Sequence, residues 1–287
     1  MRDICAVIDL VELTELGRPK MTLVAVWRHA PGRIHAIADT RISGTGQSVL
    51  TDHGPKILPL TMVCRIPGPS HFIDKEIFRA EFGFAYAGST LSALSTHALA
   101  NVLCSNLGGL PAPVPSLDQV AYAIGPIAYR YMKEIESPFR AIIFGHCPQT
   151  QQALAFEFQP RTEPGNLILD IKKHALDDST VVVLGTKPET LRERIAEVRA
   201  NASHPIVYAD APMIALKGLI AESVIPGVGG SVQQAWAHSG RLEIIATAEA
   251  IVPVPPSTTN MGLYVLGFEM SEIQTIGQYH IVLSGRM

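Results

Sequence analysis

The fold is constrained most by the stretch TLVAVWRHAPGRIHAIAD near the start of the chain. Two short apolar runs, residues 23–26 and 34–38, flank an Ala-Pro-Gly turn signal, and the second run ends at Asp39. Apolar runs of this length around turn residues predict a β-hairpin. Lys56 follows Asp39 by seventeen residues, where a loop rich in Gly, Ser and Thr gives way to another apolar segment. A hydroxyl (Thr22), a carboxylate and an amine therefore belong to one compact unit.

Periodicity along the rest of the chain predicts strands that alternate with pairs of helices. Apolar residues keep helical spacing in four segments, the second of which opens with a capping box at Ser116 and Gln119. Strands, two helices, strands, two helices, strands is the order expected when two stacked sheets are each covered by a helix pair. We therefore expect an α+β fold, arranged as a four-layer αββα sandwich. The predicted helices cover residues 91–107, 117–135, 186–199 and 210–224, and the later strands cover residues 139–146, 153–158, 167–171, 180–184, 232–236, 242–246, 263–269 and 280–283.

Four short motifs occur in an order that is known from one protein family. They are TLVAV at residues 22–26, ADTR at 38–41, KI at 56–57, and FAYAGS at 84–89, where a strand ends in Ala-Gly and runs into a helix. As an ordered set over the first third of the chain, they resemble proteasome β-type subunits and the related bacterial heat-shock peptidase subunits. These belong to the N-terminal-nucleophile (Ntn) hydrolases, whose fold is also a four-layer αββα sandwich. The resemblance and the order of elements thus imply the same architecture.

The resemblance implies an active site of five residues. Thr22 would attack the substrate as the first residue of the chain, because its own α-amine, with a pKa of about 7.7–8.0, can take the hydroxyl proton. Lys56 would favour deprotonation of the Thr22 hydroxyl and of the α-ammonium group, and Asp39 would keep that lysine charged and oriented. The backbone N–H of Gly88 would bind the oxyanion of an acyl intermediate, and Thr186 would stand in for a helper serine. The expected reaction is peptide or amide hydrolysis.

Two features depart from the family pattern. In the family pattern the nucleophile lies five positions before the last valine of the first strand, whereas Thr22 lies only four positions before Val26. By this count Met21, rather than Thr22, falls on the nucleophile position. A slip of one residue turns a side chain to the opposite face of a strand, so the two registers predict opposite orientations for Thr22. In place of the family's Asp-x-x-Ser-Gly segment the chain has PGVGG at residues 226–230, which keeps the glycines without the polar side chains.

Each of the five residues also has an ordinary structural interpretation, which stays open at this stage. Thr22 fits a plain strand residue, Asp39 a turn or ion-pair residue, and Lys56 a solvated lysine. Gly88 fits a tight turn between two elements. Thr186, three residues before a glutamate, fits a capping box for the helix that follows.

The sequence predicts no cofactor and no metal site. The segment TVVVLGT at residues 180–186 is similar to a nucleotide-binding strand and turn, but neither it nor the glycines at 227–230 match the phosphate-binding patterns G-x-G-x-x-G or G-x-x-x-x-G-K-[ST]. The ten histidines show no metal-binding spacing. His146 beside Cys147 is better explained as a packed pair than as a nucleophile and its base.

Composition limits the classes of partner. A formal net charge of −3 gives no electrostatic case for nucleic acid or for an acidic membrane surface. No apolar run approaches the roughly 20 residues of a spanning helix. Four scattered cysteines fit a reducing compartment, and no signal peptide is predicted, so we expect a cytoplasmic protein. A mean hydropathy of +0.21 indicates subunit contacts.

The chain is interpreted as an N-terminal extension or propeptide, residues 1–20, followed by a single domain, residues 21–287. Thr22 can act as the nucleophile only without the preceding segment, either after cleavage or because translation begins at Met21 and the methionine is removed. Residues 61–82 are rich in Pro, Gly and charged residues, and they predict an inserted surface loop with a short helix at residues 74–82.

Two functions stay open. In the first, the chain is a proteasome-like threonine-type peptidase subunit that acts on peptide or protein substrates inside a homo-oligomeric ring. In the second, a catalytically inactive relative keeps its N-terminal segment, which pairs as an extra strand, and the subunit serves assembly or binding. The residues do not indicate the ring size, the substrate preference or whether an ATPase is a partner.

Overall fold

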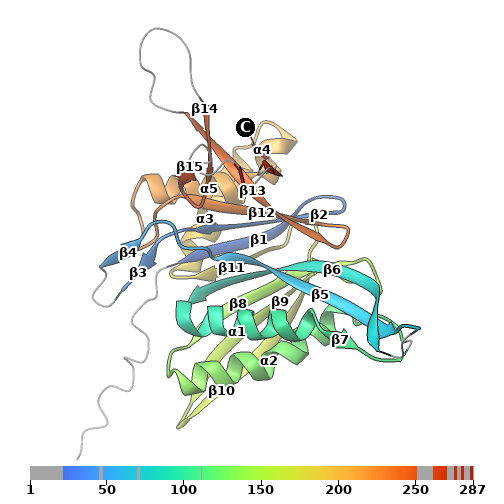
Figure 1. Cartoon of the computed structure of the whole chain (residues 1–287). Coiled ribbons are helices and arrows are strands. Elements are labelled where there is room, and N and C mark those ends of the chain that lie inside the picture. Colours follow the sequence, from blue (N-terminus) through green and yellow to red (C-terminus); the bar gives the residue numbers. More distant parts are fainter. Residues whose placement is uncertain are drawn as a thin grey trace, which may run out of the picture.

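The computed structural model describes residues 22–44, 48–69, 72–110, 112–250, 261–269, 275–276, 279–280 and 285–286 (Figure 1). The predicted N-terminal extension, residues 1–20, and Met21 lie outside the described residues. The helices are α1 (Thr90–Cys104), α2 (Leu117–Glu134), α3 (Pro188–Ala200), α4 (Pro205–Ala209) and α5 (Ala211–Ala221). The strands are β1 (Leu23–Ala30), β2 (Arg33–Asp39), β3 (Ile42–Ser43), β4 (Val49–Thr51), β5 (Ile57–Pro67), β6 (Ile73–Gly88), β7 (Leu107–Gly108), β8 (Phe139–His146), β9 (Ala153–Glu163), β10 (Asn166–Ala175), β11 (Val181–Gly185), β12 (Val232–His238), β13 (Arg241–Ala250), β14 (Met261–Val265), β15 (Phe268–Glu269), β16 (Thr275–Ile276), β17 (Tyr279–His280) and β18 (Gly285–Arg286).

The predicted N-terminal hairpin is confirmed. Strands β1 and β2 pair antiparallel, with Val24 opposite Ala38 and Val26 opposite Ala36. Leu23 packs toward the helices α3 and α5, whereas Val24 packs toward the second sheet. Both faces of β1 are therefore covered, which explains why its apolar run is continuous rather than alternating.

Most of the described strands form two large sheets. Within the described residues, one sheet has eight strands in the order β11-β1-β2-β12-β13-β14-β15, with β18 paired to β13. The other has six strands in the order β10-β9-β8-β6-β5-β7. Pairing is antiparallel in both sheets except for β13 with β18 and β5 with β7. This mixture of antiparallel sheets and separate helix pairs confirms the α+β class.

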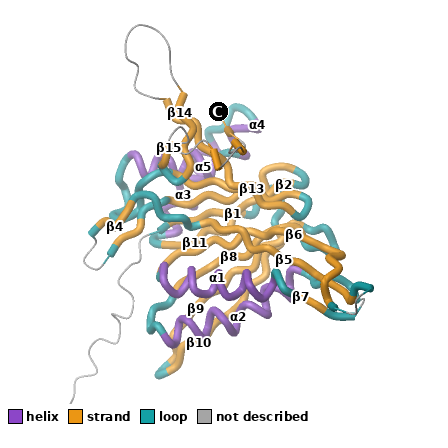
Figure 2. The backbone as a smooth tube through the Cα atoms, in the orientation of Figure 1, coloured by secondary structure: helices purple, strands orange, loops and turns teal. Residues whose placement is uncertain are grey.

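Helices gather at opposite sides of the two sheets (Figure 2). One cluster of buried side chains joins α1 and α2 to the six-stranded sheet, and a second joins α3 and α5 to the eight-stranded sheet. A third cluster combines residues of both sheets, among them Val26, Phe144 and Ala235. Each aliphatic or aromatic side chain that is fully removed from water stabilises the fold by about 1.5–3 kcal/mol, so these three clusters hold the elements together.

The surface loop predicted over residues 61–82 is wrong for most of that range. Strands β5 and β6 pair along almost their whole length, from Ile57 with Ala85 to Pro67 with Ile73. The expected short helix at residues 74–82 is part of the 16-residue strand β6. The ladder explains the difference, because the buried end of β6 sets the register and the exposed, charged end continues it through backbone hydrogen bonds.

The helix boundaries confirm one predicted cap and correct another. The capping box of Ser116 and Gln119 at the start of α2 is formed as predicted. Thr186 does not cap α3, which begins at Pro188 after Lys187 in the left-handed conformation. Asp210 occupies the N-cap position of α5 but makes no side-chain cap hydrogen bond, since its carboxylate contacts His29 instead. Among the described residues, no helix combines the length and the apolar character that crossing a membrane requires.

Candidate functional site

Thr22 and Lys56 meet in the interior. Thr22 directly precedes β1, and its hydroxyl Oγ1 accepts a hydrogen bond of 2.6 Å from Nζ of Lys56. Both residues are 2% exposed. In the register of this strand the Thr22 hydroxyl thus faces the lysine, which decides between the two orientations that the sequence left open.

Asp39 lies beside this pair at the end of β2. Its carboxylate accepts hydrogen bonds from the backbone N–H of Leu23, at 2.9 Å, and from that of Gly229, at 3.3 Å. Burial raises the pKa of Asp39 to about 6, although the charge of Lys56 and the backbone donors oppose this shift. Burial lowers the pKa of Lys56 in turn, and the carboxylate of Asp39 opposes that change. Each residue of the pair therefore keeps its partner closer to the charged form.

Two residues that the sequence analysis did not single out hold Lys56 in place. Gln233, on β12, accepts hydrogen bonds from the backbone N–H groups of Lys56 (2.7 Å) and Ile57 (2.8 Å), and its amide donates to the Ile57 carbonyl (2.7 Å). The ring of Tyr86 lies 5.7 Å from Nζ of Lys56, and its hydroxyl donates to the carbonyl of Pro55. Burial raises the pKa of Tyr86 to about 12, so the phenol stays neutral near the ammonium.

The sequence did contain a signal for Gln233. Alternate residues of β12 face the six-stranded sheet, and the other two in this set, Ala235 and Ala237, are apolar and belong to the cluster between the sheets. A buried glutamine in that series needs hydrogen-bond partners. Which backbone groups it meets depends on β5, about 176 residues away, and no local pattern indicates this.

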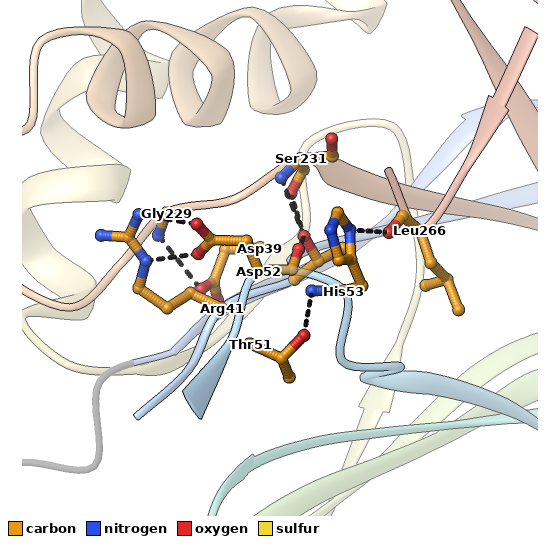
Figure 3. A network of polar contacts seen from close by, with 9 residues as sticks. Asp39, Arg41, Thr51, Asp52, His53, Gly229, Ser231 and Leu266 are labelled. Carbon is orange, nitrogen blue, oxygen red and sulfur yellow. Dashed lines mark hydrogen bonds and ion pairs between the residues drawn. The ribbon is translucent and has the colours of Figure 1, made fainter. Parts of the chain in front are cut away.

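The loop that contains PGVGG supports Asp39 through its backbone (Figure 3). Besides the Gly229 N–H, the carbonyl of Gly229 accepts from the N–H groups of Thr40 and Arg41. Arg41 pairs with Asp52 at 2.6 Å. Gly230 has a φ of +74°, and a Cβ at this position would lie 2.5 Å from Oγ1 of Thr40. The glycines are therefore required by the close approach of two loops, while the polar side chains of the family pattern are absent.

Thr186 lies next to Thr22, whereas Gly88 lies at the end of β6. The backbone N–H of Thr186 donates to the carbonyl of Thr22 at 3.0 Å, and the preceding Gly185 packs against the same carbonyl. Gly88 ends β6 with a φ of +113°, two residues beyond Tyr86 and directly before Ser89, the N-cap of α1. A Cβ on Gly88 would lie 2.9 Å from Cα of Phe139, so this corner needs glycine whether or not a substrate binds there.

The geometry brings a hydroxyl, an ammonium and a carboxylate together away from water. An ammonium that donates to a hydroxyl oxygen favours the deprotonated form of that hydroxyl, and low exposure strengthens the effect. Such a hydroxyl can act as a nucleophile when a base takes its proton. The arrangement is chemically suited to acyl transfer.

Comparison with known proteins bears on the fold. No protein-family profile and no curated protein matches the sequence. Among solved structures, Anbu (ancestral beta-subunit) from Yersinia bercovieri superposes with a TM-score of 0.52 at 13% identity, covering 77% of this chain and 86% of that one. The chain has an Anbu-like fold. A Gly-1 mutant of Anbu from Hyphomicrobium sp. strain MC1 superposes with a TM-score of 0.50 at 14% identity, covering 78% of this chain and 86% of that one. A chain of the helical assembly of the Anbu complex from Pseudomonas aeruginosa superposes with a TM-score of 0.50 at 14% identity, covering 76% of this chain and 81% of that one.

These neighbours correct the family resemblance drawn from the sequence. Anbu proteins are proteasome-like and related to the Ntn hydrolases, but they form a family distinct from the proteasome β-type subunits and the heat-shock peptidase subunits. The motifs at residues 22–26, 38–41 and 56–57 were therefore assigned to the wrong members. Short motifs of this kind reflect a shared hairpin and loop, and at 13–14% identity they do not separate families with one fold.

Proposed function

We propose that the chain is a threonine-type peptidase of Anbu-like fold, in which Thr22 hydrolyses amide bonds once it is the first residue of the mature chain. The observation that carries the proposal is the buried 2.6 Å contact between Nζ of Lys56 and Oγ1 of Thr22. Asp39, within the same buried group, supports it, because the electrostatic influence of its carboxylate raises the pKa of Lys56.

In this mechanism the α-amine of Thr22 takes the hydroxyl proton, directly or through a water, and Oγ1 attacks the substrate carbonyl. Lys56 stabilises the negative charge that develops on Oγ1, and Asp39 orients the lysine. The backbone N–H of Gly88 binds the oxyanion. Collapse of the intermediate releases the amine half of the substrate, and water then cleaves the acyl-enzyme ester. Thr186 contributes by positioning the backbone of Thr22 rather than through a cap on α3.

Mass spectrometry of the intact purified chain and turnover of fluorogenic peptides test this proposal together. We expect a mature chain that starts at Thr22 and hydrolyses peptides. Thr22→Ala should lower kcat/KM by at least about 10³-fold, whereas Thr22→Ser, which keeps a hydroxyl, should retain measurable turnover. Thr162→Ala, at the exposed end of strand β9, is the matched control and should leave the rate unchanged. A mature, folded chain in which Thr22→Ala has full activity would refute the role of Thr22.

A catalytically inactive subunit is the second candidate. The loop at residues 226–230 supports it, since PGVGG contacts Asp39 only through the backbone and offers no carboxylate or hydroxyl near the pair. In this case the N-terminal segment stays attached and the subunit serves assembly or binding. A stable chain that keeps Met1 and shows no turnover would support this candidate and contradict the first.

The remaining parts of the proposal concern architecture and assembly. We propose that residues 21–287 form one domain and that its layers are those of the four-layer αββα sandwich, which the three separate core clusters support. We also propose that identical subunits associate in the cytoplasm. The helical assembly described for Pseudomonas aeruginosa Anbu and the exposed apolar side chains of α1 support self-association.

A further inference from the structure

A second polar cluster lies on the helix-covered face of the eight-stranded sheet. It consists of His29 on β1, His35 on β2 and Asp210 at the start of α5, and it is defined here as the His-His-Asp cluster. One ligand atom of each side chain lies within 4.8 Å of the other two. His29 Nε2 contacts Oδ1 of Asp210 at 2.7 Å, and the two imidazole rings stack with centroids 4.1 Å apart.

The cluster is largely removed from water. His35 is 2% exposed and Asp210 is 7% exposed, while the side chain of His29 retains 16%. The carboxylate of Asp210 is turned toward His29 instead of capping α5, although Asp at an N-cap position normally accepts from the helix N–H groups. Nδ1 of His29 is buried and makes no hydrogen bond within the described part of the chain. This chain therefore gives up a helix cap to hold a carboxylate among imidazoles.

Both tryptophans of the chain flank the cluster. The ring of Trp236 stacks on His35 and that of Trp27 meets it edge-on, each with centroids 5.2 Å apart. Arg33 lies over the ring of Trp236, at 4.5 Å from the ring centroid. Any change in the position or charge of His35 must alter the environment of both indoles.

We propose that the His-His-Asp cluster binds a divalent transition metal ion of the Zn²⁺ class. Two imidazoles and one carboxylate are a donor set that suits Zn²⁺, Ni²⁺ or Co²⁺, whereas Mg²⁺ and Ca²⁺ prefer oxygen ligands only. Three protein ligands leave a fourth position for water or for a group from solvent. The ion would tie β1 and β2 to the first turn of α5, elements that are about 180 residues apart in the chain.

Binding requires a small rearrangement of these side chains. Zn²⁺ bonds of about 2.0–2.2 Å place tetrahedral ligand atoms about 3.3 Å apart, so the His29–Asp210 contact must open slightly. The stacked imidazoles must also fan apart, because each ring nitrogen binds a metal in the plane of its ring.

Comparison with other pairs in the chain explains why this cluster differs from an ordinary ion pair. His174 contacts Glu157 and His238 contacts Glu243, each at 3.0 Å. Among the described residues, neither pair has a third metal-binding side chain within the same reach, and the His-His-Asp cluster does. The spacing of the three residues in the sequence follows no metal-binding motif, so the sequence analysis predicted no metal.

The test is a metal titration of the untagged full-length chain after treatment with EDTA. We expect one equivalent of Ni²⁺ to quench the tryptophan fluorescence in a saturable way, and one equivalent of Zn²⁺ to raise the melting temperature. Asp210→Asn keeps an acceptor for His29 but removes the negative ligand, and it should weaken both effects by at least about tenfold in metal concentration. His238→Gln, on the same strand as Trp236, is the matched control and should bind like the wild type.

Several outcomes would overturn the proposal. One is the absence of saturable quenching by Ni²⁺ in the folded wild-type chain. Another is equal affinity in wild type and Asp210→Asn, and a third is an equal loss in His238→Gln, which would indicate adventitious binding to surface histidines. Circular dichroism of each variant establishes that it is folded before the comparison. Thr22→Ala should bind the metal normally, so this result is independent of the proposed peptidase.

Discussion

At the scale of single residues, the central feature is an ammonium and a carboxylate held out of water next to a hydroxyl. Lys56 is 2% exposed and Asp39 is fully buried. Burial raises the pKa of Asp39 and lowers that of Lys56, which favours the neutral form of each residue. The charge of each residue opposes the shift in the other. Asp39, with a pKa of about 6, therefore changes its charge close to that pH.

The first prediction concerns the pH dependence of catalysis. With a pKa of about 6, Asp39 is protonated below that pH, and Lys56 then loses the charge that raises its own pKa. We expect kcat/KM to fall as the pH decreases through about 6, and to rise toward pH 8 as the α-amine of Thr22 loses its proton. Asp39→Asn should lower the rate and remove the step near pH 6. A profile between about pH 5 and 9 measures both effects.

The stability of the fold gives an independent check on the same group. Because the folded-state pKa of Asp39 is raised above its ordinary value of 3.8, the folded protein binds protons more readily than the unfolded chain. Its contribution to stability is therefore fully present below about pH 3.8 and is lost as the pH rises through about 6. In denaturant unfolding, the free energy of unfolding of the wild type should increase relative to that of Asp39→Asn as the pH falls from 7 to 4. A constant difference across this range would show that Asp39 does not titrate as described.

The second prediction concerns Lys56. Lys56→Met keeps a long side chain but removes the donor to Thr22, so kcat/KM should fall by about 10²–10⁴-fold. The folded state should also lose stability, because Asp39 keeps its backbone donors but is left buried without its cationic partner. Single-turnover kinetics and thermal unfolding measure the two effects. Lys173→Met, which removes a surface ion pair with Asp118, is the control and should leave the rate unchanged. Equal activity in Lys56→Met and wild type would contradict the mechanism.

Single residues of the candidate site were partly predictable from the sequence. Thr22, Asp39 and Lys56 were singled out because they lie on one hairpin and its following loop, within motifs that resemble a known family. Gln233 and Tyr86 were not, because their contacts to Lys56 and Pro55 form only when distant strands meet. The His-His-Asp cluster was not predicted for the same reason, since Asp210 and His29 are 181 residues apart in the chain.

At the scale of secondary structure, periodicity predicted most strands and helices, and backbone pairing decided where they end. The hairpin β1–β2, the capping box of α2 and the strands β8 and β9 follow the predicted pattern. Residues 74–82 did not, because charged residues on an exposed strand end look like a helix or loop in isolation. The ladder with β5 supplies the hydrogen bonds that favour the strand.

The third prediction concerns the junction of β11 with Thr22. Gly185 has a φ of +116°, and a Cβ there would lie 1.7 Å from the carbonyl oxygen of Thr22. Gly185→Ala should therefore destabilise the fold by about 3 kcal/mol or more, and displace Thr22 from Lys56. Gly109→Ala, where the added methyl meets open space, should change stability by less than about 0.5 kcal/mol. Urea unfolding of both variants measures the difference, and similar values would show that β11 does not constrain Thr22.

At the scale of the whole molecule, the candidate site joins two sheets. Thr22 directly precedes β1 and Asp39 ends β2, both in the eight-stranded sheet, whereas Lys56 directly precedes β5 of the six-stranded sheet. Gln233 spans the same gap from β12. The geometry of the hydroxyl and the ammonium therefore depends on how the two sheets pack, and any loss of packing between them should separate the pair.

The fourth prediction concerns self-association. On α1, Leu91, Val102 and Leu103 are 64%, 57% and 50% exposed, which is unusual for apolar side chains on one helix face. We expect light scattering to give a mass several times the 31.0 kDa of one chain. Leu103→Asp should shift the protein toward the single-chain mass without unfolding it. Leu50→Asp, at an exposed apolar position on β4, is the control and should keep the assembly. A wild-type chain that stays monomeric would contradict this prediction.

The amino-acid sequence by itself determined most of the strands, the helix pairs and the α+β class, because apolar periodicity and turn residues act within a few positions of the chain. It also placed a hydroxyl, a carboxylate and an amine around one hairpin. Only the tertiary structure decided that Lys56 faces Thr22, that Gly229 and Gln233 support the pair, and that two histidines meet Asp210. These contacts join residues far apart in the chain. They arise from the packing of sheets and helices, which leaves no repeating pattern in the sequence around each residue.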